Sequence, residues 1–286
     1  MPMTLSDDVR RSTERVSRRT RRLCAAVTAL VVVAAVPTFF VEGVLNGTPV
    51  MNGSARGTAL TMFALAMPVL VVGLATSTRG SVWGRAALIG ALGYLTYNAA
   101  LFVYATPFNE LFLAYVALFG LSLWSLVSAL LDPRPLLAPD SGLPARGIAA
   151  FIFTVVALNA LAWLRFVVPD LGEDPPGFLD GTGLTTNPIY VQDLAVWLPA
   201  LAIVAVLLWQ RRPSGVFLAG AGLVFWVIEA IGVAVDQWFG HRADPGSDVA
   251  TVASVVLFVV LTGATLVPLV LWLHAVPERT REGGQS

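Results

Sequence analysis

Long apolar stretches alternate with short polar turns along almost the whole chain. A membrane-spanning helix needs about 20 predominantly apolar residues to cross the roughly 30 Å hydrocarbon layer. Stretches of this length predict eight helices, near residues 23–45, 58–77, 84–105, 110–131, 147–168, 190–210, 215–238 and 251–275. The runs are continuous and lack the two-residue alternation of a barrel strand. The pattern therefore predicts an all-α, polytopic transmembrane helical bundle.

The composition agrees with lipid as the solvent of this fold. Hydrophobic residues make up 56% of the 286-residue chain and charged residues only 13%, which excludes a water-soluble globular protein. The chain divides into an arginine-rich arm at 1–22, a transmembrane domain at 23–275 and a tail at 276–286. Within the transmembrane domain, an acidic loop rich in proline and glycine at 169–189 is too broken to span.

All 18 basic residues are arginine, and they are distributed unevenly between the two sides of the predicted helices. Fifteen lie in the arm, in alternate turns or in the tail, and only Arg56, Arg165 and Arg242 lie on the other side. Cytoplasmic loops of helical membrane proteins carry the excess of basic residues. Both termini are therefore expected in the cytoplasm, and the loop at 169–189 outside.

The arginine-rich arm allows other interpretations. Ser17-Arg18-Arg19 before an apolar run superficially resembles a twin-arginine export signal, and seven arginines could also bind nucleic acid. The first apolar run is long for a signal peptide, however, and seven more spans follow it. We interpret the arm as an orienting segment that contacts acidic lipid headgroups, and we expect no nucleic-acid partner.

Polar side chains concentrate in the outer half of the spans. Such groups are costly in hydrocarbon and usually face a protein interior or a wet cavity. Glu229 and Asp236 are seven residues apart and so nearly eclipsed on one helix, with Glu229 roughly 14 Å below the surface. The candidate ligand-binding residues are Glu229, Asn98, Tyr94, Tyr97, Asp236, Asp193, Tyr190, Arg165, Asn109 and Glu42.

The cytoplasmic half of the spans holds little besides hydroxyl groups that can bond back to their own helix. The asymmetry predicts an acidic, tyrosine-rich pocket that opens outward, with Glu229 deepest and Arg165 as its internal counter-charge. The alternative for the residues nearer the surface is an interfacial aromatic belt that includes Tyr190, with Glu42, Asp193 and Asp236 at headgroup level.

A shift of 131 residues superimposes similar positions of the two halves. It places Pro68 on Pro199, Gly84 on Gly215 and Asn98 on Glu229. Four spans return the chain to its starting side, so the two copies would be parallel and related by an axis along the membrane normal. We therefore consider a 4+4 parallel repeat.

The chain shows no motif for a metal or cofactor. Cys24 stands alone and cannot form an internal disulfide. His241 and His274 fall on opposite sides of the membrane and cannot share a metal ion. We predict neither a metal site nor a cofactor.

Two stretches resemble a family of uncharacterised bacterial multi-span membrane proteins. They are Tyr94-Leu95-Thr96-Tyr97-Asn98 with the following PFNELFLAYV, and GLTTNPIYVQDL from Gly183 with Leu198-Pro199 after it. The resemblance covers roughly residues 90–235. It implies a bacterial inner-membrane protein and importance of Tyr97, Asn109, Asn187 and Asp193 to the fold or the pocket, but it brings no established activity.

Three functional classes remain open. We favour binding or transport of a small solute, cation or lipid in the outward-facing pocket, since carboxylates in spans often hold cations, protons or amines. One alternative is a membrane-embedded enzyme acting on a lipid or an extracytoplasmic substrate, although no HExxH, GxSxG or phosphate-loop motif supports it. The other alternative is a membrane sensor or assembly partner.

The predicted topology can be tested with tags at the two termini. Because the arginine excess orients the bundle, both tags are expected to be protected from protease in intact spheroplasts and digested in inverted vesicles. Digestion of either tag in intact spheroplasts would contradict the predicted orientation.

Overall fold

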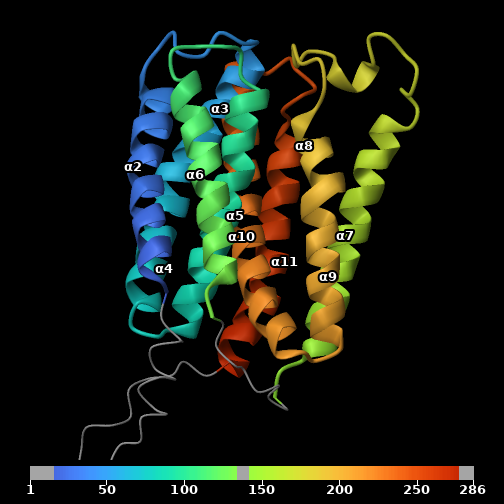
Figure 1. The fold of residues 1–286 in the computed structure, drawn as a ribbon. Coiled ribbons are helices and arrows are strands. Elements are labelled where there is room, and N and C mark those ends of the chain that lie inside the picture. Colours follow the sequence, from blue (N-terminus) through green and yellow to red (C-terminus); the bar gives the residue numbers. More distant parts are fainter. Residues whose placement is uncertain (1–15, 134–141, 277–286) are drawn as a thin grey trace, which may run out of the picture.

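The computed structural model describes residues 16–133 and 142–276, and every regular element within these two ranges is helical. Within them, eight helical spans are long and apolar enough to cross a membrane, as the hydrophobic pattern predicts. Figure 1 shows the spans side by side as a bundle. The protein is therefore a multi-pass integral membrane protein. Most of the arginine-rich arm, Arg134 and the tail from residue 277 onward lie outside the described residues.

Six spans are single helices. They are α2 (Arg18–Phe40), α5 (Val82–Tyr104), α6 (Phe112–Leu131), α7 (Ala145–Val167), α10 (Pro213–Ala243) and α11 (Val252–Ala275). The other two spans each contain one π-helical segment. The second span comprises α3 (Pro49–Thr61), η1 (Met62–Ala66) and α4 (Met67–Ser77), and the sixth comprises α8 (Pro188–Gln192), η3 (Asp193–Trp197) and α9 (Leu198–Trp209). A short 3₁₀ turn, η2 (Gly177–Leu179), lies in the connection before α8.

Several helix boundaries differ from those predicted. Helix α2 begins at Arg18 rather than at residue 23, because Ser17 caps it by accepting a hydrogen bond from the Thr20 amide at 3.1 Å. Four arginines assigned to the arm thus lie in the first turns of α2. Helix α3 begins at Pro49, nine residues before the predicted start at 58, and α10 ends at Ala243 rather than at 238.

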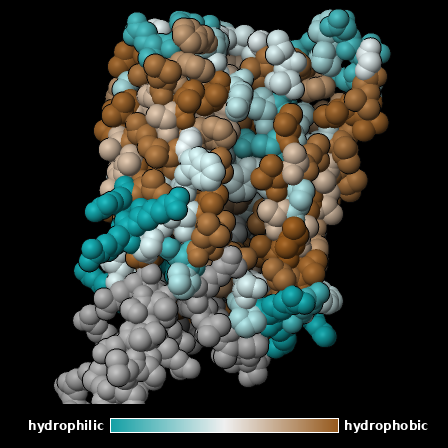
Figure 2. All heavy atoms as spheres, in the orientation of Figure 1, coloured by the Kyte–Doolittle hydropathy of each residue, from teal (hydrophilic) through white to brown (hydrophobic). Residues whose placement is uncertain are grey.

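Two helices lie at the centre of the bundle. Within the span windows, 83% of α5 and 61% of α10 are buried, whereas α7 and α11 reach only 17% and 11%. Helix α10 packs against α3, α5, α9 and α11, and α5 packs against α4, α6 and α10. Figure 2 shows hydrophobic residues over much of the side of the bundle and hydrophilic residues gathered toward its ends. The peripheral helices present the apolar surface to lipid.

Small residues allow the central helices to approach closely. A Cβ atom added to Gly57 of α3 would lie 2.6 Å from the Cα atom of Asp236 in α10. Gly220 of α10 packs against the indole ring of Trp272, whose Nε1 donates to the Val216 carbonyl at 2.7 Å. Close backbone packing is a main source of helix association in lipid, where apolar burial supplies little driving force.

We call the end of the bundle where α2 begins and α11 ends the arginine-rich end. Asp132 there accepts hydrogen bonds from the Ser17 amide at 3.0 Å and the Thr20 hydroxyl at 2.9 Å, which joins α6 to the start of α2. The buried Arg85 donates to the Ala129 carbonyl at 3.4 Å and to the Pro133 carbonyl, at the C-terminus of α6. These contacts fix the arginine-rich end of α2, α5 and α6.

The glycine contact between α3 and α10 gives a stability prediction. Gly57→Ala is expected to lower the free energy of unfolding by about 1–3 kcal/mol, because the added methyl group must push two backbones apart. Gly263→Ala in α11 is the matched control, since nothing lies within 4 Å of its added Cβ. Unfolding in mixed micelles measures both variants. Equal stability of the two would contradict this account of the packing.

Candidate functional site

The deepest polar group joins the two central helices. The Asn98 side-chain amide of α5 donates to Oε2 of Glu229 in α10 at 3.0 Å, and it also donates to the Tyr94 carbonyl at 3.2 Å. Asn98 is 4% exposed, whereas Glu229 is half-buried. We call Glu229, Asn98, Tyr94 and Asp236 the Glu229 group. With α10 ending at Ala243, Glu229 lies fourteen residues from that end, about 21 Å along the axis.

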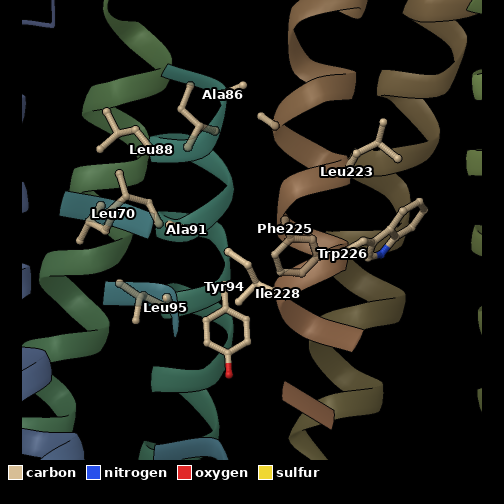
Figure 3. Packing of buried hydrophobic residues seen from close by; sticks show 14 of the residues in the cluster. Leu70, Ala86, Leu88, Ala91, Tyr94, Leu95, Leu223, Phe225, Trp226 and Ile228 are labelled. Carbon is tan, nitrogen blue, oxygen red and sulfur yellow. The ribbon is translucent and has the colours of Figure 1, made fainter. Parts of the chain in front are cut away.

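Tyr94 places a hydroxyl group between the two carboxylates of α10. The tyrosine is 1% exposed, and its hydroxyl has no well-formed hydrogen bond among the described residues, although Thr61 lies near it. The hydroxyl packs against Gly232, which is three residues after Glu229 and four before Asp236. Figure 3 shows this hydroxyl pointing away from the apolar cluster, toward the C-terminal end of α5. A buried hydroxyl without a partner can accept or donate to a ligand or a water molecule.

A second group surrounds Asp193, the first residue of η3. Its Oδ2 accepts a hydrogen bond from Trp163 Nε1 at 2.7 Å, and the side chains of Tyr97 and Asn159 also hydrogen-bond with this carboxylate. We call Asp193, Tyr97, Trp163 and Asn159 the Asp193 group. It ties the sixth span to α7 through Trp163 and to α5 through Tyr97.

An aromatic wall runs from Tyr97 of the Asp193 group to α10. Tyr97 lies 5.8 Å from the Trp197 ring and 6.1 Å from the Phe225 ring, measured between centroids, and Trp197 stacks on Phe225 at 5.1 Å. Gln192 links this wall to α5, because it accepts from Trp197 Nε1 at 3.1 Å and donates to the Tyr97 carbonyl at 3.3 Å.

The carboxylates of the two groups have no cationic partner among the described residues. No arginine or histidine in those ranges lies within 4.0 Å of an oxygen of Glu229, Asp236 or Asp193. Asp193 and Asp236 both act electrostatically on Glu229, so the three carboxylates belong to one electrostatic system. No three acidic, histidine or cysteine residues of the described chain gather closely enough to hold a metal ion together.

Four of the predicted residues, among them Tyr190, belong to neither the Glu229 group nor the Asp193 group. Arg165 is exposed, with its guanidinium carbon 5.9 Å from the centroid of Phe166, and so it does not meet Glu229 as a counter-charge. Glu42 is exposed in the turn after α2. Asn109 is buried but caps the turn before α6 by accepting from the Leu111 amide at 2.9 Å.

Tyr190 has a packing role beside the Asp193 group. Its ring stacks on Trp163 at 4.5 Å between centroids and lies 5.7 Å from Phe178 in the connection before α8. It thus joins α7 and α8 near the end of the bundle that is opposite the arginine-rich end.

Sequence reasoning missed the role of Trp163 and Gln192. Trp163 is not among the predicted site residues, although it donates to a carboxylate thirty residues later in the chain. Gln192 had no assigned role. A side-chain amide inside an apolar span indicates that Gln192 needs a polar partner. The identity of that partner, on α5, depends on how the sixth span packs against α5.

The two central helices close together below the Glu229 group, toward the arginine-rich end. A Cβ atom added to Gly90 of α5 would lie 2.8 Å from the Ala221 carbonyl oxygen and 2.7 Å from a Val224 methyl carbon. No space for a solute remains between α5 and α10 at this level.

No protein-family model, curated protein or solved structure matches the chain. The family resemblance of the two sequence stretches therefore stays a prediction.

The Asp193 group gives a test of its own hydrogen bonds. Trp163→Phe is expected to destabilise the protein by about 1–3 kcal/mol, because the buried carboxylate loses a donor. Trp124→Phe is the matched control, since Trp124 is 58% exposed on the lipid-facing side of α6. Denaturant titration of both purified variants measures the difference, and a Trp163→Phe protein as stable as the control would exclude this role.

Proposed function

We propose that the protein binds or transports a small cationic solute, taken up from the extracytoplasmic side of a bacterial plasma membrane. In this proposal the arginine-rich end is cytoplasmic, as the distribution of arginine predicts. The opposite end of the bundle faces outward. The ligand contacts Glu229, with Asn98 and Tyr94 beside it and Asp236 nearer the outer surface.

One observation carries the proposal: Glu229 lies deep in the bundle without a cationic partner among the described residues. An ionised carboxylate in a membrane interior is costly unless a cation, a proton or hydrogen-bond donors compensate its charge. Asn98 supplies one donor. Glu229 is half-buried, and the Tyr94 hydroxyl beside Gly232 can contribute an oxygen ligand.

The arrangement supports access from the outer side. Asp236 is nearer than Glu229 to the outer end of α10, so the two carboxylates can act in sequence on a cation that enters. The close contact at Gly90 blocks the path between α5 and α10 toward the cytoplasm. The close packing of α5 and α10 at this level fits a binding protein, or a transporter in its outward-open state.

The enzyme alternative has less support from the geometry. Seven residues place Glu229 and Asp236 about 10 Å apart along the axis of α10. A substrate or a water molecule would therefore have to span this separation for the two carboxylates to act as general acid and general base.

Glu229→Gln tests the proposal. The thermal midpoint of purified wild-type protein is measured in sodium, ammonium and methylammonium chlorides against N-methylglucamine chloride of equal ionic strength. At least one small cation is expected to raise the midpoint, since a ligand at 100 times its Kd stabilises by about 2.7 kcal/mol. Glu229→Gln is expected to lose this shift.

Glu42→Gln is the matched control, because Glu42 is exposed and lies outside the Glu229 group. It should keep the wild-type response. A Glu229→Gln protein that retains the full shift would remove Glu229 from the binding site, and the absence of any cation effect on wild-type protein would count against the proposed function itself.

A further inference from the structure

The two interrupted spans break at matching positions. The π-helical segments η1 (Met62–Ala66) and η3 (Asp193–Trp197) have the same length, and both bounds differ by 131 residues. Pro68 and Pro199 follow them at the same offset. Since π-helical residues make up well under 1% of globular proteins, chance seldom places two such segments in register.

The turns that follow also match. An added Cβ at Gly84 would meet Thr76 and the Ser77 amide nitrogen, and one at Gly215 would meet Leu207 and the Leu208 amide nitrogen. Every member of the first contact lies 131 residues before its counterpart in the second. The helices that contain these glycines, α5 and α10, begin at matching positions as well.

Two contacts between α5 and α10 join a residue to its own counterpart. Gly90 meets Ala221, and Asn98 is hydrogen-bonded to Glu229, each across 131 residues of sequence. A residue can contact its own counterpart only where it lies beside the symmetry axis. The two contacts are eight residues apart, about 12 Å along the helices, so the axis runs along the α5–α10 pair.

We infer that residues from α2 to α6 and from α7 to α11 are two copies of one four-helix unit, with the Asn98–Glu229 contact on their shared axis, and that ligands reach Glu229 between α5 and α8. We place the entrance there because α5 and α8 lack the extra turns that α3 and α10 have. The inferred route of the ligand to Glu229 rests on the proposed function, whereas the repeat does not.

The copies differ at the end opposite the arginine-rich end. The sixth span starts later than its counterpart: α8 begins at the position that matches Gly57, which is eight residues after the start of α3. Helix α5 also ends earlier than its counterpart, at the position that matches Val235, which is eight residues before the end of α10. Each shortfall corresponds to about 12 Å of helix.

The extra turns of α3 in the first copy and of α10 in the second copy seal the junction between these two helices. An added Cβ at Gly53 would lie 2.9 Å from Gly240 Cα, and one at Gly57 would lie 2.6 Å from Asp236 Cα. The junction between α5 and α8 has no such turns. Gln192, the last residue of α8, lies at this junction and donates a hydrogen bond to the Tyr97 carbonyl. Figure 2 shows the surface hollowed between α6 and α9 on the face it draws, with hydrophilic residues along the upper edge of the hollow.

An exchange of the two axial residues tests the repeat. Asn98→Glu alone places two carboxylates across the axis, and Glu229→Asn alone places two amides there. If the positions are equivalent, the double variant restores one amide and one carboxylate in mirrored arrangement. Its thermal midpoint is expected to return at least halfway from that of the Asn98→Glu variant to the wild-type value. Additive effects of the two substitutions would overturn the axial placement.

Cysteine accessibility tests the entrance. Cys24 is the only cysteine of the chain, so Cys24→Ala gives a cysteine-free background. Gln192→Cys and its counterpart Thr61→Cys are then labelled in intact cells with a charged, membrane-impermeant maleimide. Because thiol reactivity follows exposure, Gln192→Cys is expected to react at least about tenfold faster. Equal rates, or faster labelling of Thr61→Cys, would overturn the entrance.

The two experiments separate the inference from the proposed function. Thermal midpoints and labelling rates require no bound ligand. A chain that passes both tests but shows no cation effect would keep its repeat and its opening and lose the proposed cation binding. If cations stabilise the protein but the two cysteine variants are labelled at equal rates, the proposed binding stands and the ligand reaches Glu229 by another route.

Discussion

Helices that meet within lipid gain little from apolar burial, because acyl chains are as apolar as the side chains that replace them. Their association depends on backbones that approach closely and on polar groups that find partners. Both occur along the α5–α10 pair, at Gly90 and at the hydrogen bond between Asn98 and Glu229. The remaining helices pack around this pair, and the least buried spans, α7 and α11, each have one main neighbour.

The same pair explains why polar chemistry is confined to one half of the bundle. Below the Glu229 group, glycine and alanine bring α5 and α10 into contact and leave no room for solvent. Above it, Tyr94 occupies the space beside Gly232, and the sixth span meets α5 through Gln192 and the Asp193 group. Neighbours from other helices reduce the cost of burying two of the carboxylates, because Asn98 donates to Glu229 and Trp163 donates to Asp193.

The sequence predicted the eight spans because length and apolarity alone define a membrane helix. It also predicted that Asn98 and Glu229 are important, since each is a polar residue deep in a span. The helix ends were less predictable. Ser17 and Pro49 start helices in polar sequence, where caps rather than hydropathy decide the boundary. The expected counter-charge at Arg165 was not found, because α7 turns that side chain outward.

The sequence by itself determined the solvent of this protein, the number of its spans and the residues that are costly to bury, because these properties depend on composition and local periodicity. The tertiary structure decided which of those residues meet. It joined Asn98 to Glu229 and Trp163 to Asp193, and it separated Glu42 and Arg165 from them. Periodicity fixes the face of a helix on which a side chain lies, but the neighbour of that face depends on packing between helices far apart in the chain.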